Sequence, residues 1–220
     1  MTDFTSHSCI DGLHETLKWT GGPTPLLPVR LLAACRMLHT LDCSHTWLSD
    51  LSFLAACRML HTLDCSHTTV SDLSSLAACT ALTLRSLDCS HTDVSDISPL
   101  ASCTALEQLR FRNTGVSDVS PLASCKALTR LTCSHTTVSD LSSLAACTAL
   151  VVLDCSYTHV SDVSPLASCK ALNKLDCRLS GVTNGSALAC HVEMGFAVKD
   201  DDDVNVFFEE DGGDYEGDYD

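Results

Sequence analysis

The sequence predicts an α/β solenoid, in which a curved parallel β-sheet lines the concave side and 3₁₀ or short helical turns line the convex side. Three observations predict this fold. Apolar residues make up 45% of the chain but aromatic residues only 5%, which favours a thin, layered core of small side chains. Each unit contains a short polar–apolar alternation, which is typical of a strand with one buried face. Seven leucines recur at intervals of 22 residues, with one interval of 24: Leu41, Leu63, Leu87, Leu109, Leu131, Leu153 and Leu175.

The repeats are close copies of one another, with the consensus LxxLDCSHTxVSDLSPLAxCxA. Residues Ala33–Thr46 match Ala55–Thr68 at every position, and Cys65–Leu82 match Cys133–Leu150 in the same way. A single unit of this length cannot bury its apolar edge alone, whereas stacked units share one continuous core. We therefore expect stability to be distributed along the array, and many shared surface residues to be relics of duplication.

The first half of each unit predicts a strand and the second half a tight return segment. Leu38, Leu41 and Cys43 alternate with polar residues, as in a short strand. A unit of 22 residues is too short for a strand, a full helix and two loops, so the return is 3₁₀ or a single turn. Pairs such as Ser98-Pro99 fit a helix N-cap followed by proline. A recurrent aspartate before them predicts turns in which a carboxylate accepts backbone N–H groups: Asp50, Asp72, Asp96, Asp118, Asp140 and Asp162.

Two columns of cysteines occupy apolar positions. A buried free cysteine behaves as a small hydrophobe, so we expect both columns to pack in the core. The sequence has no CxxC pair and no His/Cys cluster with zinc spacing. Disulfides between adjacent rungs stay open as an alternative, because strand neighbours lie about 4.8 Å apart, although parallel side chains oppose them. The columns are Cys43, Cys65, Cys89, Cys133, Cys155 and Cys177 on the strands, and Cys35, Cys57, Cys79, Cys103, Cys125, Cys147 and Cys169 on the return segments.

The pattern LxxLxCxxTxL resembles the leucine-rich repeat, with cysteine at an apolar position and threonine where the family usually has asparagine. The second half of the unit, as in Val94–Leu100, is similar to the 22-residue subtype of bacterial internalins and of a regulatory subunit of protein phosphatase 1. Seven copies over about Leu38–Cys190 carry this resemblance. It implies a leucine-rich-repeat solenoid that presents a surface for binding another protein.

We expect three segments. Residues 1–37 hold a degenerate capping repeat, residues 38–190 the leucine-rich-repeat domain, and residues 191–220 a cap remnant and an acidic tail. Residues 199–220 hold eleven acids and one lysine, a net charge of −10 out of −15 for the chain. Segments of this kind are usually disordered and solvating. Within the tail, Phe207 and Phe208 suggest a docking motif for a basic partner, and mimicry of nucleic-acid phosphate is a further alternative.

Outward-facing strand residues form the candidate partner-binding surface on the concave face. Stacked aspartates should repel one another, which raises their pKa values. Arg110, Arg112 and Arg130 interrupt the acidic columns, and arginine is favoured as an interface anchor. They either bind a partner's carboxylates or only neutralise the stacked aspartates. The predicted contact residues are Asp42, Asp64, Asp88, Arg110, Arg112, Arg130, Asp154, Asp176 and Arg178.

A further column of histidines near the aspartates suggests a metal site or a pH switch. Isolated stacked rungs lack the converging geometry of a metal site, so duplication explains the column more simply, and we predict no metal and no cofactor. No Ser/His/Asp order, glycine-rich phosphate loop or paired acid stands out from the repeat, so we predict no catalytic residue and no enzyme. The column is His45, His67, His91 and His135, continued by Asn113 and Tyr157.

The predicted function is a non-catalytic protein-protein interaction module, monomeric, whose partner the sequence does not identify. The alternatives are a regulatory subunit of an enzyme such as a phosphatase, and a secreted or surface adhesion protein of internalin type. Without clustered Lys and Arg on the body, we expect no nucleic-acid and no membrane partner. The first residues lack a basic region followed by an apolar stretch, and fifteen cysteines favour reduced thiols, so we expect a cytoplasmic or nuclear location.

Overall fold

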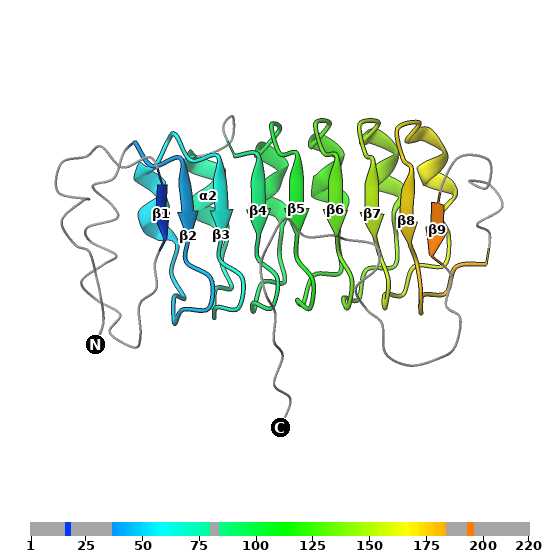
Figure 1. Cartoon of the computed structure of the whole chain (residues 1–220), viewed down its shortest axis with the longest axis horizontal. Coiled ribbons are helices and arrows are strands. Elements are labelled where there is room, and N and C mark those ends of the chain that lie inside the picture. The colour runs from blue at the N-terminus through cyan, green and yellow to red at the C-terminus, as the bar shows by residue number, and fades with distance from the viewer. Residues whose placement is uncertain (1–15, 19–36, 80–83, 184–192, 196–220) are drawn as a thin grey trace, which may run out of the picture.

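The structure is a computed structural model that describes residues 16–18, 37–79, 84–183 and 193–195. Within these residues, three-residue strands form one parallel sheet in which every strand pairs with the next one in the sequence (Figure 1). The predicted solenoid with a curved parallel sheet is confirmed. The strands are β1 (Thr16–Lys18), β2 (Thr40–Asp42), β3 (Thr62–Asp64), β4 (Ser86–Asp88), β5 (Gln108–Arg110), β6 (Arg130–Thr132), β7 (Val152–Asp154), β8 (Lys174–Asp176) and β9 (Glu193–Gly195).

The leucine at the centre of each repeat strand sets the register of the sheet. Leu41 pairs with Leu63, and Leu63 pairs with Leu87 although two extra residues separate them. The surplus is therefore absorbed outside the strands. The sheet also extends beyond residues 38–190, because β1 pairs with β2 through Leu17 and β9 pairs with β8 through Met194. Both flanking segments, which we expected to be caps, thus contribute a strand.

The return segments lie behind the sheet in Figure 1 and stack on one another. Most are 3₁₀ helices, as the unit length predicts, and one is a short α-helix. The row consists of η1 (Ser52–Ala56), α2 (Ser74–Cys79), η2 (Ser98–Ser102), η3 (Ser120–Ser124), η4 (Ser142–Ala146) and η5 (Ser164–Ser168).

The aspartate column before the return segments is structural, as predicted. Asp96 Oδ1 accepts the backbone N–H of Ser98 at 2.7 Å, and Oδ2 accepts the Ser98 hydroxyl at 3.0 Å. The same two bonds recur with Asp50, Asp72, Asp118, Asp140 and Asp162. The predicted serine N-cap is wrong, because Ser98 is already the first residue of η2 and the cap position is Ile97, whose side chain cannot accept a bond.

The core between the two layers is built from leucine, valine and cysteine. The eleven cysteines among the described residues are free and buried, which confirms that they pack in the core. Phe111 replaces cysteine on the strand side of one unit and is also fully buried. The register of β5 with its neighbours is unchanged there, so the core accepts the ring without a shift of the sheet.

A column of buried threonine hydroxyls closes the turn after each strand. Thr136 Oγ1 donates to the carbonyl oxygen of Cys133 at 2.6 Å. Between them His135 has a positive φ of 54°, which turns the chain away from the sheet. The threonine hydroxyl thus satisfies a buried carbonyl. Equivalent bonds come from Thr46, Thr68, Thr92 and Thr158.

The threonine column gives a stability prediction. Thr136→Val preserves the shape of the side chain but leaves the Cys133 carbonyl without the hydroxyl, so we expect a loss of about 1–3 kcal/mol in the free energy of unfolding. Thr137→Val, at the neighbouring exposed position, is the matched control and should change little. Urea unfolding followed by circular dichroism measures both, and equal effects of the two variants would show that the buried bond is unimportant.

Candidate functional site

The aspartates at the ends of the strands serve the backbone as well as the surface. Asp64 Oδ1 accepts the backbone N–H of Ser66 at 2.9 Å, and Asp88 bonds Ser90 in the same way at 2.9 Å. Asp42 accepts both the N–H and the hydroxyl of Ser44. Turn formation therefore explains why aspartate recurs in this column, and its recurrence alone is not evidence for a binding role.

Burial, more than stacking, controls the ionisation of these aspartates. Burial raises the pKa of Asp64 and of Asp154, and the neighbouring aspartates add a smaller increase. Burial also acts on Asp42, but hydrogen bonds from Ser44 and Lys18 outweigh it and lower its pKa. The predicted increase is thus confirmed for Asp64 and Asp154 and wrong for Asp42, since Lys18 lies 2.9 Å from its carboxylate.

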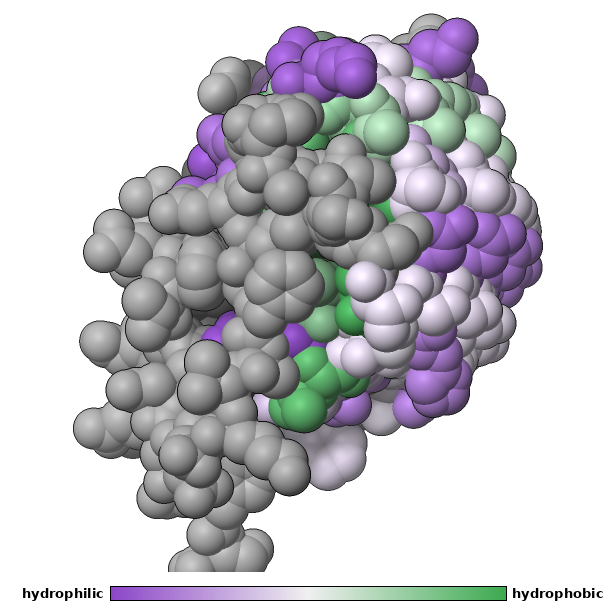
Figure 2. Space-filling view, turned by 90° about the vertical axis from the view of Figure 1, so that its right-hand side faces the viewer, coloured by the Kyte–Doolittle hydropathy of each residue, from purple (hydrophilic) through white to green (hydrophobic). Residues whose placement is uncertain are grey.

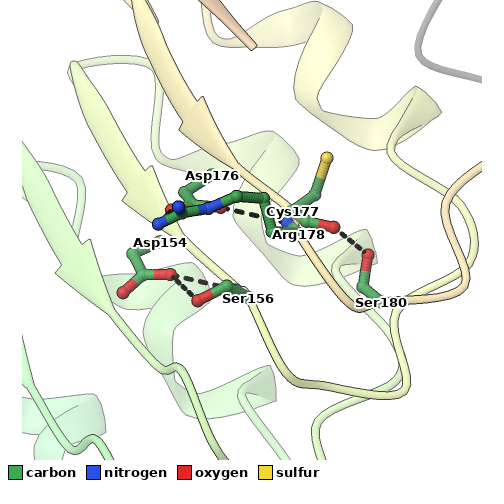
Figure 3. A network of polar contacts seen from close by, with 6 residues as sticks. All are labelled: Asp154, Ser156, Asp176, Cys177, Arg178 and Ser180. Carbon is green, nitrogen blue, oxygen red and sulfur yellow. Dashed lines mark hydrogen bonds and ion pairs between the residues drawn. The ribbon is translucent and has the colours of Figure 1, made fainter. Parts of the chain in front are cut away.

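Two of the predicted contact residues are not accessible. Asp154 is 7% exposed and Asp176 is 4% exposed. Asp154 Oδ1 accepts the hydroxyl of Ser156 at 2.6 Å, and the guanidinium of Arg178 lies over the Asp176 carboxylate with its Nη2 at 2.6 Å (Figure 3). The expectation that Asp154 and Asp176 face a partner is therefore wrong, and Arg178 is already engaged by an internal carboxylate.

The three arginines of β5, β6 and the turn after β5 lie close together, and we call Arg110, Arg112 and Arg130 the Arg patch. Arg130 pairs with Gln108, two residues before Arg110, so the three Cα atoms lie within about 7–10 Å of their nearest partners. The side chains of Arg110 and Arg130 are exposed, while the Nε of Arg112 is buried without a hydrogen-bond partner among the described residues. The patch therefore combines accessible charge with an unused donor.

Neutralisation of the stacked aspartates accounts for only one member of the Arg patch. Arg110 Nη1 lies 3.8 Å from Asp88 Oδ2, at the outer limit of an ion pair. In the described part of the chain, neither Arg112 nor Arg130 forms a salt bridge. Two positive charges on the concave side thus have no counter-charge among the residues that the structure describes.

The histidine column is a stack of rings at left-handed backbone positions. The rings of His45 and His67 lie 4.3 Å apart, those of His67 and His91 4.2 Å apart, and those of His135 and Tyr157 4.1 Å apart. Sequence reasoning found the column but missed its backbone, in which every member has a φ of 52–55°. The asparagine in the same column was the available signal, because asparagine tolerates this conformation well.

Three members of the histidine column, His67, His91 and His135, have pKa values below the ordinary value. Burial lowers the pKa of His91 and His135, and the positive charge of Arg112 is the next cause for both. Burial and the neighbouring rings lower the pKa of His67. Among the described residues no group of three or more His, Cys, Asp or Glu side chains is arranged to hold a metal ion.

Exposed apolar side chains are scattered over the described surface. In the end-on view of Figure 2 that surface is mainly hydrophilic or intermediate, and strongly apolar residues form small separate areas. Such isolated residues are ordinary on soluble surfaces. This distribution leaves the charged concave face as the most distinctive surface of the array. The exposed large apolar residues are Met37, Trp47, Met59, Tyr157 and Leu179.

The stacked strands, the 22-residue period and the polar concave face define a leucine-rich-repeat protein. Residues 82–124 match the family model for Leucine Rich repeats (2 copies), and a search of curated proteins gives no match. The solved structure of internalin C2 from Listeria monocytogenes is similar over 83% of this chain and 80% of its own, with 25% identity and a TM-score of 0.76. The chain is accordingly a leucine-rich-repeat protein of the internalin-like type.

Two further structures share the fold at lower identity. Internalin InlF from Listeria monocytogenes matches with 23% identity and a TM-score of 0.68, over 78% of this chain and 57% of its own. The leucine-rich-repeat ectodomain of the plant membrane receptor kinase GASSHO1/SCHENGEN3 from Arabidopsis thaliana matches with 19% identity and a TM-score of 0.66, over 80% of this chain and 22% of its own. Leucine-rich-repeat proteins of these kinds are protein-binding modules and are generally non-catalytic.

These comparisons correct the expected location. A cytoplasmic or nuclear protein is wrong, because the similar structures are internalins and receptor ectodomains, which point to the extracellular side. The inference from cysteines failed for a physical reason. Oxidation needs an accessible thiolate, and burial raises the pKa of Cys125 to about 12 and of Cys147 to about 11. Buried thiols therefore do not report the redox state of a compartment.

Some predictions fall on residues that the structure does not describe. The acidic tail, its expected disorder, and the docking residues Phe207 and Phe208 all lie outside the described residues. Within the described ranges, no helix has the length and apolar character needed to cross a membrane.

The opposite pKa shifts of two aspartates predict opposite responses to pH. Since burial raises the pKa of Asp64 above its unfolded value, its ionisation weakens folding as pH rises through the folded pKa. Asp64→Asn should therefore raise the melting temperature at pH 7 and change it little at pH 3. Bonds from Ser120 lower the pKa of Asp118, so Asp118→Asn should lower the melting temperature at pH 7. Calorimetry at both pH values measures this, and shifts of equal sign at pH 7 would contradict it.

Burial of the cysteines predicts low reactivity. In the native protein at pH 8, the eleven described cysteines should resist modification by a maleimide, while all fifteen should react in concentrated urea. Peptide mapping by mass spectrometry assigns the modified sites. Modification of Cys125 or Cys147 faster than global unfolding would show that the core is open there.

Proposed function

We propose that the chain binds a protein partner through the concave face of its sheet, with the Arg patch as the anchor. One observation carries this proposal. Three of the seven repeat units place Asp-Cys-Ser-His at the end of the strand and three others depart from it at one or two positions, whereas the unit of β5 places Arg-Phe-Arg-Asn there, at residues 110–113. Four adjacent positions change together in an array of near-identical copies, and two of the new residues are arginines on the concave side.

The chemistry of the Arg patch favours acidic groups on the partner. A guanidinium offers a planar set of donors that binds carboxylates in a bidentate manner. Arg112 brings a buried Nε with no hydrogen-bond partner in the described part of the chain, and an unsatisfied buried donor is costly. A partner carboxylate that reached this group would remove that cost.

The accessible aspartates set the boundary of the proposed surface. Asp42, Asp64 and Asp88 stay partly exposed on the N-terminal side of the Arg patch. They would repel an acidic partner segment that shifted along the array, which favours one register over others. Asp154 and Asp176 take no part in direct contact, because both are buried.

The proposed module is monomeric, has no catalytic residue and needs no cofactor. Each candidate acid, histidine or serine is one member of a column in which the same contacts recur from unit to unit, as with the bonds from Asp96 to Ser98 and from Asp118 to Ser120. The recurring contacts explain these residues through turn formation, which supports a surface-binding role over catalysis.

A second candidate is adhesion at a cell surface, in the manner of internalins. The similarity to internalin C2 and InlF supports it. Two plant receptors with this fold, RGFR1 and GASSHO1/SCHENGEN3, were solved in complex with RGF2 and with CASPARIAN STRIP INTEGRITY FACTOR 2, which supports ligand binding by an array of this kind. Adhesion would use the same concave face and differs in the partner, which would be a surface protein of another cell.

The test is a charge-matched comparison of two triple variants. Arg110→Ala/Arg112→Ala/Arg130→Ala removes the Arg patch, while Arg58→Ala/Lys126→Ala/Lys170→Ala removes three exposed cations that follow the return segments. Affinity capture with mass spectrometry from cell-surface and secreted protein preparations would identify partners of the native chain. We expect the patch variant to bind them at least about tenfold more weakly, as loss of an interface anchor does, and the control to bind normally. Equal binding by both variants would reject the Arg patch as anchor.

A further inference from the structure

The end of the sheet lies on the same row as the Arg patch. Strand β9 ends at Gly195, which pairs with Asp176. Along the same row Asp176 pairs with Asp154, Asp154 with Thr132, and Thr132 with Arg110. The chain therefore leaves the sheet level with Arg110 and four strands away, which is roughly 19 Å at the usual strand spacing.

The number of residues that follow Gly195 matches this distance. An extended chain covers about 3.3 Å per residue, so about six residues span the four strands. Six residues after Gly195 is Asp201, in the middle of the four consecutive aspartates Asp200–Asp203. The first dense block of negative charge therefore becomes available where the first accessible block of positive charge lies.

The order of charges along the row agrees with the order along the chain. Travelling from β9, the row carries carboxylates at Asp176 and Asp154, then Thr132 on β6 and Arg110 on β5, while Arg130 lies two residues before Thr132 on β6. The chain carries three apolar residues, 196–198, then Lys199, then Asp200–Asp203. At the same spacing Lys199 would fall between β7 and β6, and Asp200 and Asp201 would fall near Arg110. A segment that continued straight would bring Asp202 and Asp203 level with Asp88, which repels them, so the segment has to turn toward Arg112 at that point.

The Arg patch can accept these carboxylates. In the described residues its one ion pair joins Arg110 to Asp88 at 3.8 Å, and the Nε of Arg112 has no hydrogen-bond partner. The two histidines nearest Arg112 in the ring column, His91 and His135, place no negative charge beside it. The facing charged groups are Asp88 from β4 and Asp154 from β7, and Asp154 is buried and bonded to Ser156.

We propose that Asp200–Asp203 of this chain bind the Arg patch of the same molecule, so that the acidic segment occupies the concave face until a partner displaces it. The contact itself needs no external partner. Only its displacement by a partner rests on the proposed function.

A tethered contact of this kind is present but readily displaced. Single exposed ion pairs are weak, and salt screens them over about 10 Å at 0.1 M. The short connection compensates, because it holds the acidic block near the patch at an effective concentration in the millimolar range. A partner with better-fitting carboxylates can therefore replace the segment without unfolding anything.

The experiment is zero-length cross-linking in the full chain. Arg112→Lys keeps the positive charge and introduces an amine, which a carbodiimide joins only to a carboxylate in direct contact. Peptide mapping should find position 112 coupled to one of residues 200–203, at least about fivefold more than the exposed native Lys126 and Lys170, at low salt where the contact is unscreened. The coupling should fall to the level of these lysines in 0.5 M NaCl, and in a chain that also carries Asp200→Asn, Asp201→Asn, Asp202→Asn and Asp203→Asn.

Several outcomes would overturn the inference. Coupling of position 112 only to Asp88 or Glu107, or coupling no stronger than at Lys126, would show that the segment does not occupy the patch. Mixing ¹⁵N-labelled with unlabelled chain tests for a second copy, and cross-links found only between differently labelled chains would assign the contact to that copy. Circular dichroism confirms that the variant is folded.

Failure here is distinguishable from failure of the proposed function. If cross-linking fails while the triple alanine variant of the Arg patch still loses its partner, the self-contact is rejected and the partner surface stands. If cross-linking succeeds, the chain with Asp200–Asp203 replaced by asparagine should bind the partner several-fold more tightly, because the tethered competitor is gone. Unchanged partner affinity would show that the acidic segment does not compete with the partner for the Arg patch.

Discussion

The structure depends on the in-register stacking of one apolar edge upon the next. Leu131 pairs with Leu109 on one side and with Leu153 on the other, and a single unit of this size cannot enclose a core until its neighbours cover it. The strand residues on either side of each central leucine therefore point away from the core, and together they form the concave face. Every outward residue, including those of the Arg patch, takes its place from this one-dimensional packing.

Much of this fold could be predicted because the constraint is periodic. The period, the strand residues, the turn aspartates and the buried cysteines all followed from spacing. Features that break the period could not be predicted from spacing. Residues Ser74–Cys79 and Ser142–Cys147 have the same sequence, yet the first forms the α-helix α2 and the second forms η4 with a C-cap at Cys147. Identical residues cannot encode that difference, so it arises from the surroundings of the two segments, through tertiary context.

The sequence predicted where the candidate site lies, but for a related reason it did not predict the contacts of its individual residues. Spacing assigned Asp42 and Asp176 to the same column, but Lys18 contacts one and Arg178 covers the other. These partners lie in the least regular units, where no repeat pattern constrains them. Likewise, the left-handed backbone of the histidine column is invisible to a pattern of apolar residues, although it sets the direction in which those rings point.

The unit of β5 shows how a duplicated array acquires specificity. Copying gives every unit the same surface, and a uniform surface cannot distinguish one register of a partner from another. Replacement of Cys by Phe111 inside the core and of Asp and Ser by two arginines outside changes one unit on both sides of its strand without moving the sheet. Because the register is held by the leucines alone, the outward residues are free to change, and the place where they changed most is the place where recognition is best sought.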